Sequence, residues 1–160
     1  MTKFDAPWGL SLKVLTLLSV LILLGLALIG LLNIAGGGNV WLFSMLILPL
    51  AILIGSAFFT IRGYHLTEGV LKVQRLGWES EINLKGLQSV EADPEAMDKS
   101  FRTFGNGGLF CFAGKFRNKR LGSYRAFATD PKRAVTLKFP DRTIVVTPGD
   151  PEAFVAQVSR

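Results

Sequence analysis

The sequence contains very few of the residues from which catalytic and metal sites are built. It has one cysteine, Cys111, and one histidine, His65, in 160 residues. A single cysteine excludes an intramolecular disulfide and a multi-cysteine metal site, and a single histidine excludes any mechanism that needs two imidazoles. Cys111 stands in the apolar run 109–112, which favours a buried, unreactive thiol. No serine or carboxylate motif supplies a nucleophile with its base, so we expect no metal, no cofactor and no enzymatic activity.

Acidic residues are missing from one long segment of the chain. Between residues 99 and 129 there is no aspartate or glutamate, although the segment carries seven lysines and arginines. Five of these surround one predicted hairpin tip and form the candidate binding site: Lys115, Arg117, Lys119, Arg120 and Arg125. Two interpretations stay open. The tip binds anionic lipid headgroups or another anionic group, or it is a solvated loop that follows the positive-inside bias.

Charge is also missing from two long hydrophobic runs, residues 14–34 and 40–61. Each run matches the ~20 residues that span the hydrocarbon of a bilayer, so the pair predicts two transmembrane helices. The first run is too long for a signal-peptide core, and a second run follows it almost at once. Pro49 predicts a bend in the second helix. The absence of ionisable residues argues against a proton or ion path through these helices.

The residues around the two runs predict how the chain crosses the membrane. Only residues 35–39 separate the runs, so we expect a helical hairpin with both ends on one side. Lys3, Lys13 and Arg62 flank that side, whereas the connection carries no charge. The positive-inside rule then places both termini in the cytoplasm of a multi-pass protein of the inner, or only, cell membrane.

Residues 62–160 have the composition of one small globular domain, which gives a division of the chain into a hairpin at 1–61 and a cytoplasmic domain at 62–160. This part carries 16 lysines and arginines against 11 acidic residues, so it contains most of the net positive charge. A basic domain tethered to a bilayer lies close to anionic headgroups, and the tether argues against nucleic acid as a partner.

Short alternating segments separated by turns predict that this domain is mostly β. The first four strands are predicted as a meander, and four more follow: residues 63–67, 70–76, 78–84, 87–91, 109–116, 122–129, 134–139 and 143–146. The glycine-rich residues 105–108 are expected to form a tight corner, because no Gly-Lys-Ser/Thr follows them as in a phosphate-binding loop.

The chain ends in a predicted amphipathic helix over residues 150–158. Asp150 suits the N-cap, Pro151 the first helical position and Glu152 the positive end of the helix dipole. The expected fold class is therefore membrane-anchored α+β. A two-helix transmembrane hairpin precedes an antiparallel β-barrel or sandwich of about seven strands that the C-terminal helix caps.

Four segments of the domain carry a resemblance to a known family. Residues 64–71, 82–90, 105–110 and 147–154 resemble the bacterial pleckstrin-homology-like domains of small membrane proteins, and the similarity spans nearly all of residues 62–160. The resemblance implies a pleckstrin-homology-like fold. It does not choose a function, because this fold serves lipid binding, peptide binding and scaffolding.

The function that these observations favour is a noncatalytic, membrane-anchored binding or scaffold module at the inner face of the bacterial cytoplasmic membrane. Its expected partners are anionic lipid headgroups and either a protein or a second copy of the chain. An alternative is an accessory subunit of a membrane transport or envelope-building complex, in which the hairpin packs against a larger membrane protein. An enzyme of unknown type remains the third alternative.

Overall fold

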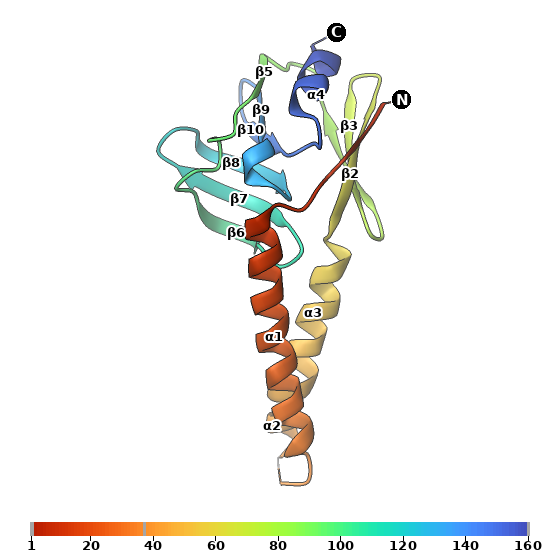
Figure 1. Ribbon diagram of the computed structural model, residues 1–160, viewed down its shortest axis with the longest axis vertical. Coiled ribbons are helices and arrows are strands. Elements are labelled where there is room, and N and C mark those ends of the chain that lie inside the picture. Colours follow the sequence, from red (N-terminus) through yellow and green to blue (C-terminus); the bar gives the residue numbers. More distant parts are fainter. Residues whose placement is uncertain (1, 37, 160) are drawn as a thin grey trace.

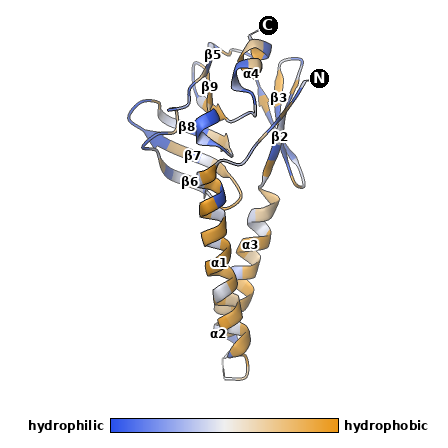
Figure 2. Ribbon diagram, viewed as in Figure 1, coloured by the Kyte–Doolittle hydropathy of each residue, from blue (hydrophilic) through white to orange (hydrophobic). Residues whose placement is uncertain are grey.

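The computed structural model describes residues 2–36 and 38–159, and it consists of a long helical hairpin beneath a β domain (Figure 1). The first limb of the hairpin is α1 (Leu10–Leu32). The second limb runs through α2 (Asn39–Leu42), a π-helical segment (Phe43–Ile47) and α3 (Leu48–Phe58). Each limb is long and apolar enough to cross a bilayer, and Figure 2 shows both as mostly hydrophobic, with one hydrophilic patch at the end of α1 next to the β domain.

The limbs differ from the predicted runs at their ends. The first helix begins at Leu10, four residues before the predicted start, because Lys13 is accommodated within a helical turn. The second ends at Phe58 instead of residue 61, because Ile61 already begins a strand and is buried in the β domain. Pro49 is the second residue of α3, which follows the π-helical segment, a common irregularity where the hydrogen-bond ladder of a helix is interrupted. Gly37, within the predicted turn 35–39, lies outside the described residues.

The strands form two sheets. The four-stranded sheet is antiparallel, in the order β1 (Thr2–Asp5), β2 (Ile61–Thr67), β3 (Val70–Arg75) and β4 (Glu79–Asn83). The six-stranded sheet has the order β5 (Ser89–Ala92), β9 (Val135–Lys138), β10 (Thr143–Val146), β8 (Gly122–Ala128), β7 (Phe112–Asn118) and β6 (Phe101–Gly107). A 3₁₀ turn (Pro131–Arg133) lies between β8 and β9.

Several sequence-based expectations for the strands were wrong. The described residues form ten strands, nine of them from Ile61 onwards, instead of about seven. Of the two predicted arrangements, a barrel or a sandwich, the barrel is wrong, because the two sheets do not close. The predicted fourth strand leaves the meander and pairs with β9 in the other sheet. β8 and β10 are parallel neighbours, whereas every pair was expected to be antiparallel. Most of the predicted corner at 105–108 belongs to strand β6, because Gly105 and Gly107 keep their pairing with β7.

The main hydrophobic core lies between the two sheets. Its fully buried residues come from both sheets and include Tyr64, Leu71 and Leu137. The C-terminal helix α4 (Pro151–Val158) closes one end of this core with Phe154, whose ring meets Phe4 of β1 at 5.1 Å. Asp150 caps α4 as predicted, accepting a hydrogen bond from the backbone N–H of Ala153 at 3.0 Å.

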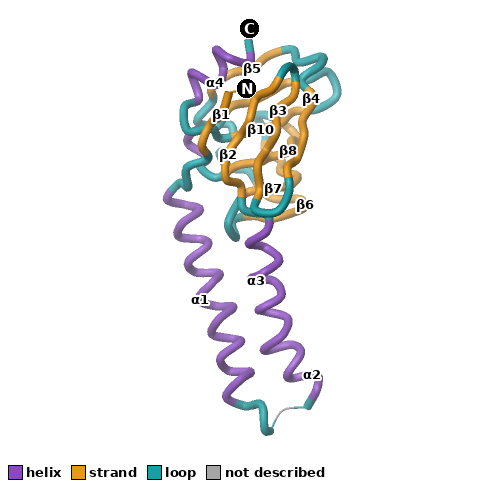
Figure 3. Tube along the Cα trace, turned by 90° about the vertical axis from the view of Figure 1, so that its right-hand side faces the viewer, coloured by secondary structure: helices purple, strands orange, loops and turns teal. Residues whose placement is uncertain are grey.

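A second core on the outer face of the six-stranded sheet attaches the hairpin to the β domain. Leu12 of α1 is fully buried there with Phe116 and Tyr124. The Thr16 hydroxyl donates to Gly108 O and accepts from the backbone N–H of Phe110, both at 3.0 Å. The hairpin and the β domain are therefore packed together, with the hairpin extending away from the sheets (Figure 3).

Candidate functional site

The predicted basic site lies on the hairpin of β7 and β8. Lys115 and Arg125 are direct cross-strand partners, so their side chains share one face of the sheet. The neighbouring pair Phe116 and Tyr124 points to the opposite face and is buried in the second core. The alternation therefore presents two cations together on the face that continues the inter-sheet core, and Arg125 stacks over the Phe127 ring at 4.9 Å.

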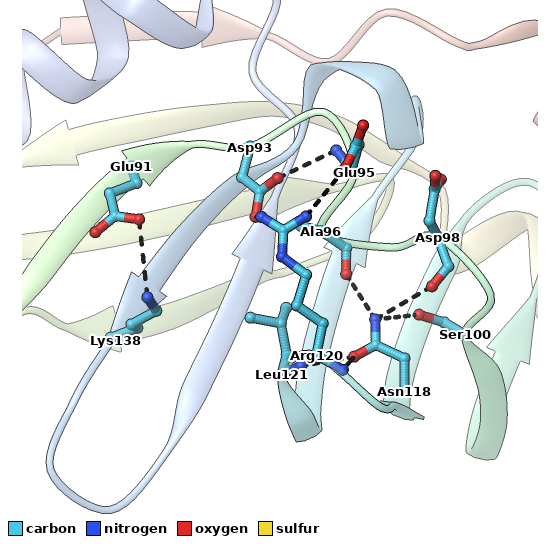
Figure 4. A network of polar contacts seen from close by, with 10 residues as sticks. All are labelled: Glu91, Asp93, Glu95, Ala96, Asp98, Ser100, Asn118, Arg120, Leu121 and Lys138. Atoms are coloured by element: carbon cyan, nitrogen blue, oxygen red, sulfur yellow. Dashed lines mark hydrogen bonds and ion pairs between the residues drawn. The ribbon is translucent and has the colours of Figure 1, made fainter.

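Arg120 has a different environment from the other four residues of the predicted site. Its guanidinium forms an ion pair with Asp93 and a longer one, at 3.5 Å, with Glu95 (Figure 4). Both acids belong to the loop that follows β5. Arg120 is thus neutralised within the domain and joins the hairpin tip to that loop.

Asn118 fixes the same tip from the inside. Its buried amide donates to Ala96 O and to the Ser100 hydroxyl, both at 2.9 Å, and its oxygen accepts from the backbone N–H groups of Arg120 and Leu121 (Figure 4). These bonds satisfy the polar groups of the turn without water. The tip is a structured corner, and Arg117 and Lys119 project from it as exposed side chains.

Lys115 and Arg125 also line a pocket between α3 and the sheet. The pocket has a volume of about 820 Å³, and its walls come from the last turns of α3 and from strands β6, β7 and β8. Two further cations line it, Arg75 at the end of β3 and Arg102 on β6. We call these four side chains, Arg75, Arg102, Lys115 and Arg125, the basic cluster.

Sequence reasoning missed two members of the basic cluster. Arg102 lies in the acid-free segment, which was the available signal, but 13 residues separate it in the sequence from Lys115. Arg75 lies 40 residues before Lys115 and has no signal of its own. The pairing of β6 with β7 and the packing of β3 across the core bring them together.

Arg75 is the most deeply placed of the four. It donates to the carbonyl of Phe59 at 2.9 Å and to the Ser80 hydroxyl at 3.2 Å, and its guanidinium lies within 6 Å of three aromatic rings, those of Phe59, Trp78 and Phe127. Burial lowers the pKa of Arg75 from its ordinary value, and the nearby charge of Arg125 acts in the same direction. An arginine nevertheless stays charged, so this site keeps a poorly solvated cation.

Within its own pocket the basic cluster has no acidic counterpart among the described residues, whereas Glu81 and Asp141 line an adjoining pocket that Lys115 and Arg125 share. None of the residues that line the pocket is an aspartate or glutamate. Within residues 2–36 and 38–159, the ion pairs involve Lys72, Arg120, Arg133 and Lys138, and none involves a member of the basic cluster. The pocket is thus a concentration of positive charge beside an apolar helix, which suits an anion better than any neutral ligand.

Cys111 and His65, the residues that a catalytic site could use, are not among the residues that line this pocket. Burial raises the pKa of the Cys111 thiol to about 11, so the reactive thiolate is suppressed at neutral pH. His65 is buried in β2 between the cross-strand neighbours Lys3 and Lys72, and its Nδ1 has no hydrogen-bond partner among the described residues. No group of three or more metal-ligating side chains occurs in the described part of the chain.

The fold and this site were compared with known proteins. The profile of the bacterial PH domain matches residues 62–160, which is more than half of the chain. The chain belongs to this family. No curated protein and no solved structure matches it. PH domains are generally noncatalytic modules that bind lipids or proteins, so the family identifies the β domain as a binding module.

The PH domain offers a second feature that a binding module can use. β6 is the terminal strand of the six-stranded sheet, and it pairs only with β7. Phe101 and Phe104 on this strand are 58% and 75% exposed. An open strand edge with exposed aromatic rings is a common surface for the addition of a partner strand.

Proposed function

We propose that this chain is a noncatalytic, membrane-anchored PH-domain module that binds a protein partner or a second copy of itself at the inner face of the bacterial cytoplasmic membrane. The observation that carries the proposal is the open edge of β6, with its exposed Phe101 and Phe104, on a PH domain that is packed against an apolar hairpin. Such a module holds its recognition edge at a fixed height and angle above the bilayer.

The membrane anchor is supported by the surface of the hairpin. Leu21 on α1 and Ile54 on α3 are 59% and 60% exposed, and they belong to a continuous apolar surface on both limbs. An apolar surface of this extent is stable in lipid and costly in water. The absence of charge from the connecting turn and the basic residues near the domain support a cytoplasmic location for the domain.

The hairpin tip of the PH domain supports contact with anionic headgroups. Arg117 and Lys119 are exposed and face no acidic partner among the described residues, and Lys115 and Arg125 lie beside them. Each basic side chain near an anionic surface contributes about 1 kcal/mol. These contacts would orient the domain, and Arg120 would act indirectly by holding the tip in place through Asp93.

One observation favours the alternative of an accessory subunit in a larger membrane complex. A Cβ added at Gly25 or at Gly55 would meet nothing within 4 Å, so both glycines lie on open parts of the hairpin surface. Small residues at such positions allow another transmembrane helix to approach closely. In this alternative the hairpin, and not the edge of β6, is the recognition element.

Site-specific photo-crosslinking in native membranes separates the two functions. A photoreactive phenylalanine analogue replaces Phe101 on β6, Leu21 on α1 or, as a control, exposed Lys132 beyond β8. The scaffold function predicts a discrete adduct from position 101, with either one other protein or a second copy of the chain, and none from position 132. Adducts from position 21 alone would favour the accessory subunit and contradict the scaffold.

A further inference from the structure

The pocket beside α3 has two chemically different halves. One half is the helix wall, formed by the small or apolar residues Ala51, Ile52 and Gly55. The other half is the basic cluster on the sheet. A site that is apolar on one side and cationic on the other fits an anionic amphiphile, a molecule with an anionic head and an apolar tail.

Part of the pocket wall is backbone without side chains. Gly105 and Gly114 are cross-strand partners in β6 and β7, and both line the pocket. Their φ angles are +102° and +147°, and an added Cβ would lie 2.4 Å and 2.1 Å from a carbonyl oxygen of the opposite strand. Both positions therefore require glycine. The Arg102 guanidinium lies against this backbone and donates to Gly105 O at 3.0 Å.

The basic cluster has no counter-anion within its own pocket among the described residues. The guanidinium groups of Arg75 and Arg125 both lie over the same ring, Phe127, at 5.5 Å and 4.9 Å from its centroid. Two further cations line the same pocket, and none of the four is paired with a carboxylate among the described residues. Like charges that share a partly desolvated site repel each other, and a bound phosphate removes this repulsion while accepting hydrogen bonds from arginine.

We propose that this pocket binds one molecule of an anionic membrane phospholipid, with its headgroup phosphate held by Arg75, Arg102, Lys115 and Arg125 and an acyl chain lying along α3. The proposal rests on the membrane anchoring proposed above. It also names the class of lipid that the PH domain would bind and the pocket that would hold it. The charge selects an anion, and the apolar wall at Ala51 and Ile52 selects a lipid over a free phosphate. An acidic peptide would leave that wall unused.

The first test is native mass spectrometry of the full-length protein extracted from bacterial membranes in a mild detergent. The unmodified protein should carry one anionic phospholipid. The double variant Lys115→Gln/Arg125→Gln should lose it, and its affinity for that lipid in nanodiscs should fall about 25-fold, or about fivefold for each charge removed. The matched control Lys85→Gln/Lys132→Gln removes the same charge from exposed positions outside the pocket and away from the hairpin tip, and it should retain the lipid.

A second variant tests the apolar half without changing charge. Gly55 lines the pocket, and a Cβ added there meets nothing within 4 Å, so Gly55→Leu is compatible with the fold and fills the space proposed for the acyl chain. This variant should lose the bound lipid. Gly25→Leu, at the other open glycine of the hairpin, is the control and should retain it.

Three outcomes would overturn the lipid proposal. The first is the absence of a phospholipid adduct from the unmodified protein. The second is an equal loss of lipid from the Lys115/Arg125 and the Lys85/Lys132 double variants, which would indicate a diffuse surface charge. The third is displacement of the lipid by millimolar inorganic phosphate or by an acidic peptide. The crosslinking from position 101 is measured on the same variants, so a failure of the lipid site is distinguished from a failure of the proposed scaffold function.

Discussion

Tyr64 joins the two sheets through a single buried hydroxyl. The hydroxyl donates to Phe127 O at 2.6 Å and accepts from the backbone N–H of Thr147 at 3.1 Å. Both partners belong to the six-stranded sheet or its immediate extension, whereas Tyr64 belongs to β2 of the other sheet. One side chain thus satisfies polar groups that the packing of two sheets would otherwise leave without water or partner.

Removing this hydroxyl should destabilise the protein measurably. We expect Tyr64→Phe to lower the free energy of unfolding by about 1–3 kcal/mol, because it leaves a buried N–H without its acceptor. Tyr124→Phe is the matched control, with a smaller loss, since its hydroxyl donates to Ser100, which also accepts from Asn118. Denaturant titration in detergent, followed by tryptophan fluorescence, measures both. Equal losses in the two variants would contradict this role of Tyr64.

The same phenol predicts a loss of stability at alkaline pH. Burial raises the pKa of Tyr64 to about 12, although hydrogen bonds with Thr147 lower it in part. In the unfolded chain the pKa is about 10, so between these values the folded state holds a proton that the unfolded state has released. This contribution is fully present below pH 10 and is lost as the pH rises towards 12.

The expected loss from Tyr64 is about 3 kcal/mol across this interval, measured by unfolding at a series of pH values. Burial also raises the pKa of Cys111, to about 11, so the decline should begin near pH 9. In Tyr64→Phe the decline between pH 10 and 12 should be shallower by the Tyr64 contribution. An unchanged slope in that variant would contradict the assignment.

Among the elements, the helical hairpin contains a small residue, Gly30, at a point where its two limbs are in close contact. A Cβ added at Gly30 of α1 would lie 2.8 Å from the carbonyl carbon of Met45. Because the limbs are antiparallel with a short connection, residues equally far from the turn face each other, which places Gly30 against the π-helical segment.

The crossing predicts that valine substitutions at two glycines of α1 differ widely in their effect on stability. Gly30→Val should destabilise the hairpin by about 1–3 kcal/mol through overpacking against Met45. Gly25→Val, where an added Cβ meets nothing within 4 Å, should cost little. Thermal unfolding of both variants in the same detergent measures the difference. A Gly25→Val loss as large as that of Gly30→Val would show that helix propensity, and not contact, is responsible.

The elements also differ in how well the sequence predicts them. The alternation of Val135 and Leu137 with polar residues, and the capping residue Asp150, indicated a strand and a helix that the structure contains. The strand Thr2–Asp5 was not predicted. Its four residues carry no long apolar pattern, and only their pairing with β2 makes them a strand. Local signals predict local structure, while the partner of an edge strand is a property of the fold.

For the molecule as a whole, the N-terminal residues are part of the packing of the PH domain. β1 extends the four-stranded sheet, and Leu12 fills the outer core. We therefore expect a fragment of residues 62–160 to be markedly less stable than the full chain and to recover when a peptide of residues 1–16 is added. Circular dichroism and amide hydrogen exchange measure this. A fragment as stable as the full chain would contradict the prediction.

The proposed membrane topology gives a further whole-molecule prediction. In a Cys111→Ser background, a cysteine introduced by Asn39→Cys at the tip of the hairpin should react in intact cells with a maleimide that cannot cross the membrane. A cysteine introduced by Lys132→Cys in the PH domain should react only after the cells are permeabilised. The reverse labelling pattern would contradict the cytoplasmic location of the domain.

The sequence by itself determined that the chain has two long apolar segments, a mostly β domain of the bacterial PH family and a strongly basic stretch without acidic residues. These properties depend on composition and on short-range periodicity, which are complete in the chain before it folds. The same residues predicted the candidate site as five cations at one hairpin tip.

Only the tertiary structure decided which cations lie together. Cross-strand register placed Lys115 beside Arg125, whereas packing of the loop after β5 paired Arg120 with Asp93. The approach of β3 and β6 to α3 added Arg75 and Arg102, which lie far from the tip in the sequence. Charge is a property of single residues, but a binding site needs distance, desolvation and the absence of counter-ions, and these exist only once the chain has packed.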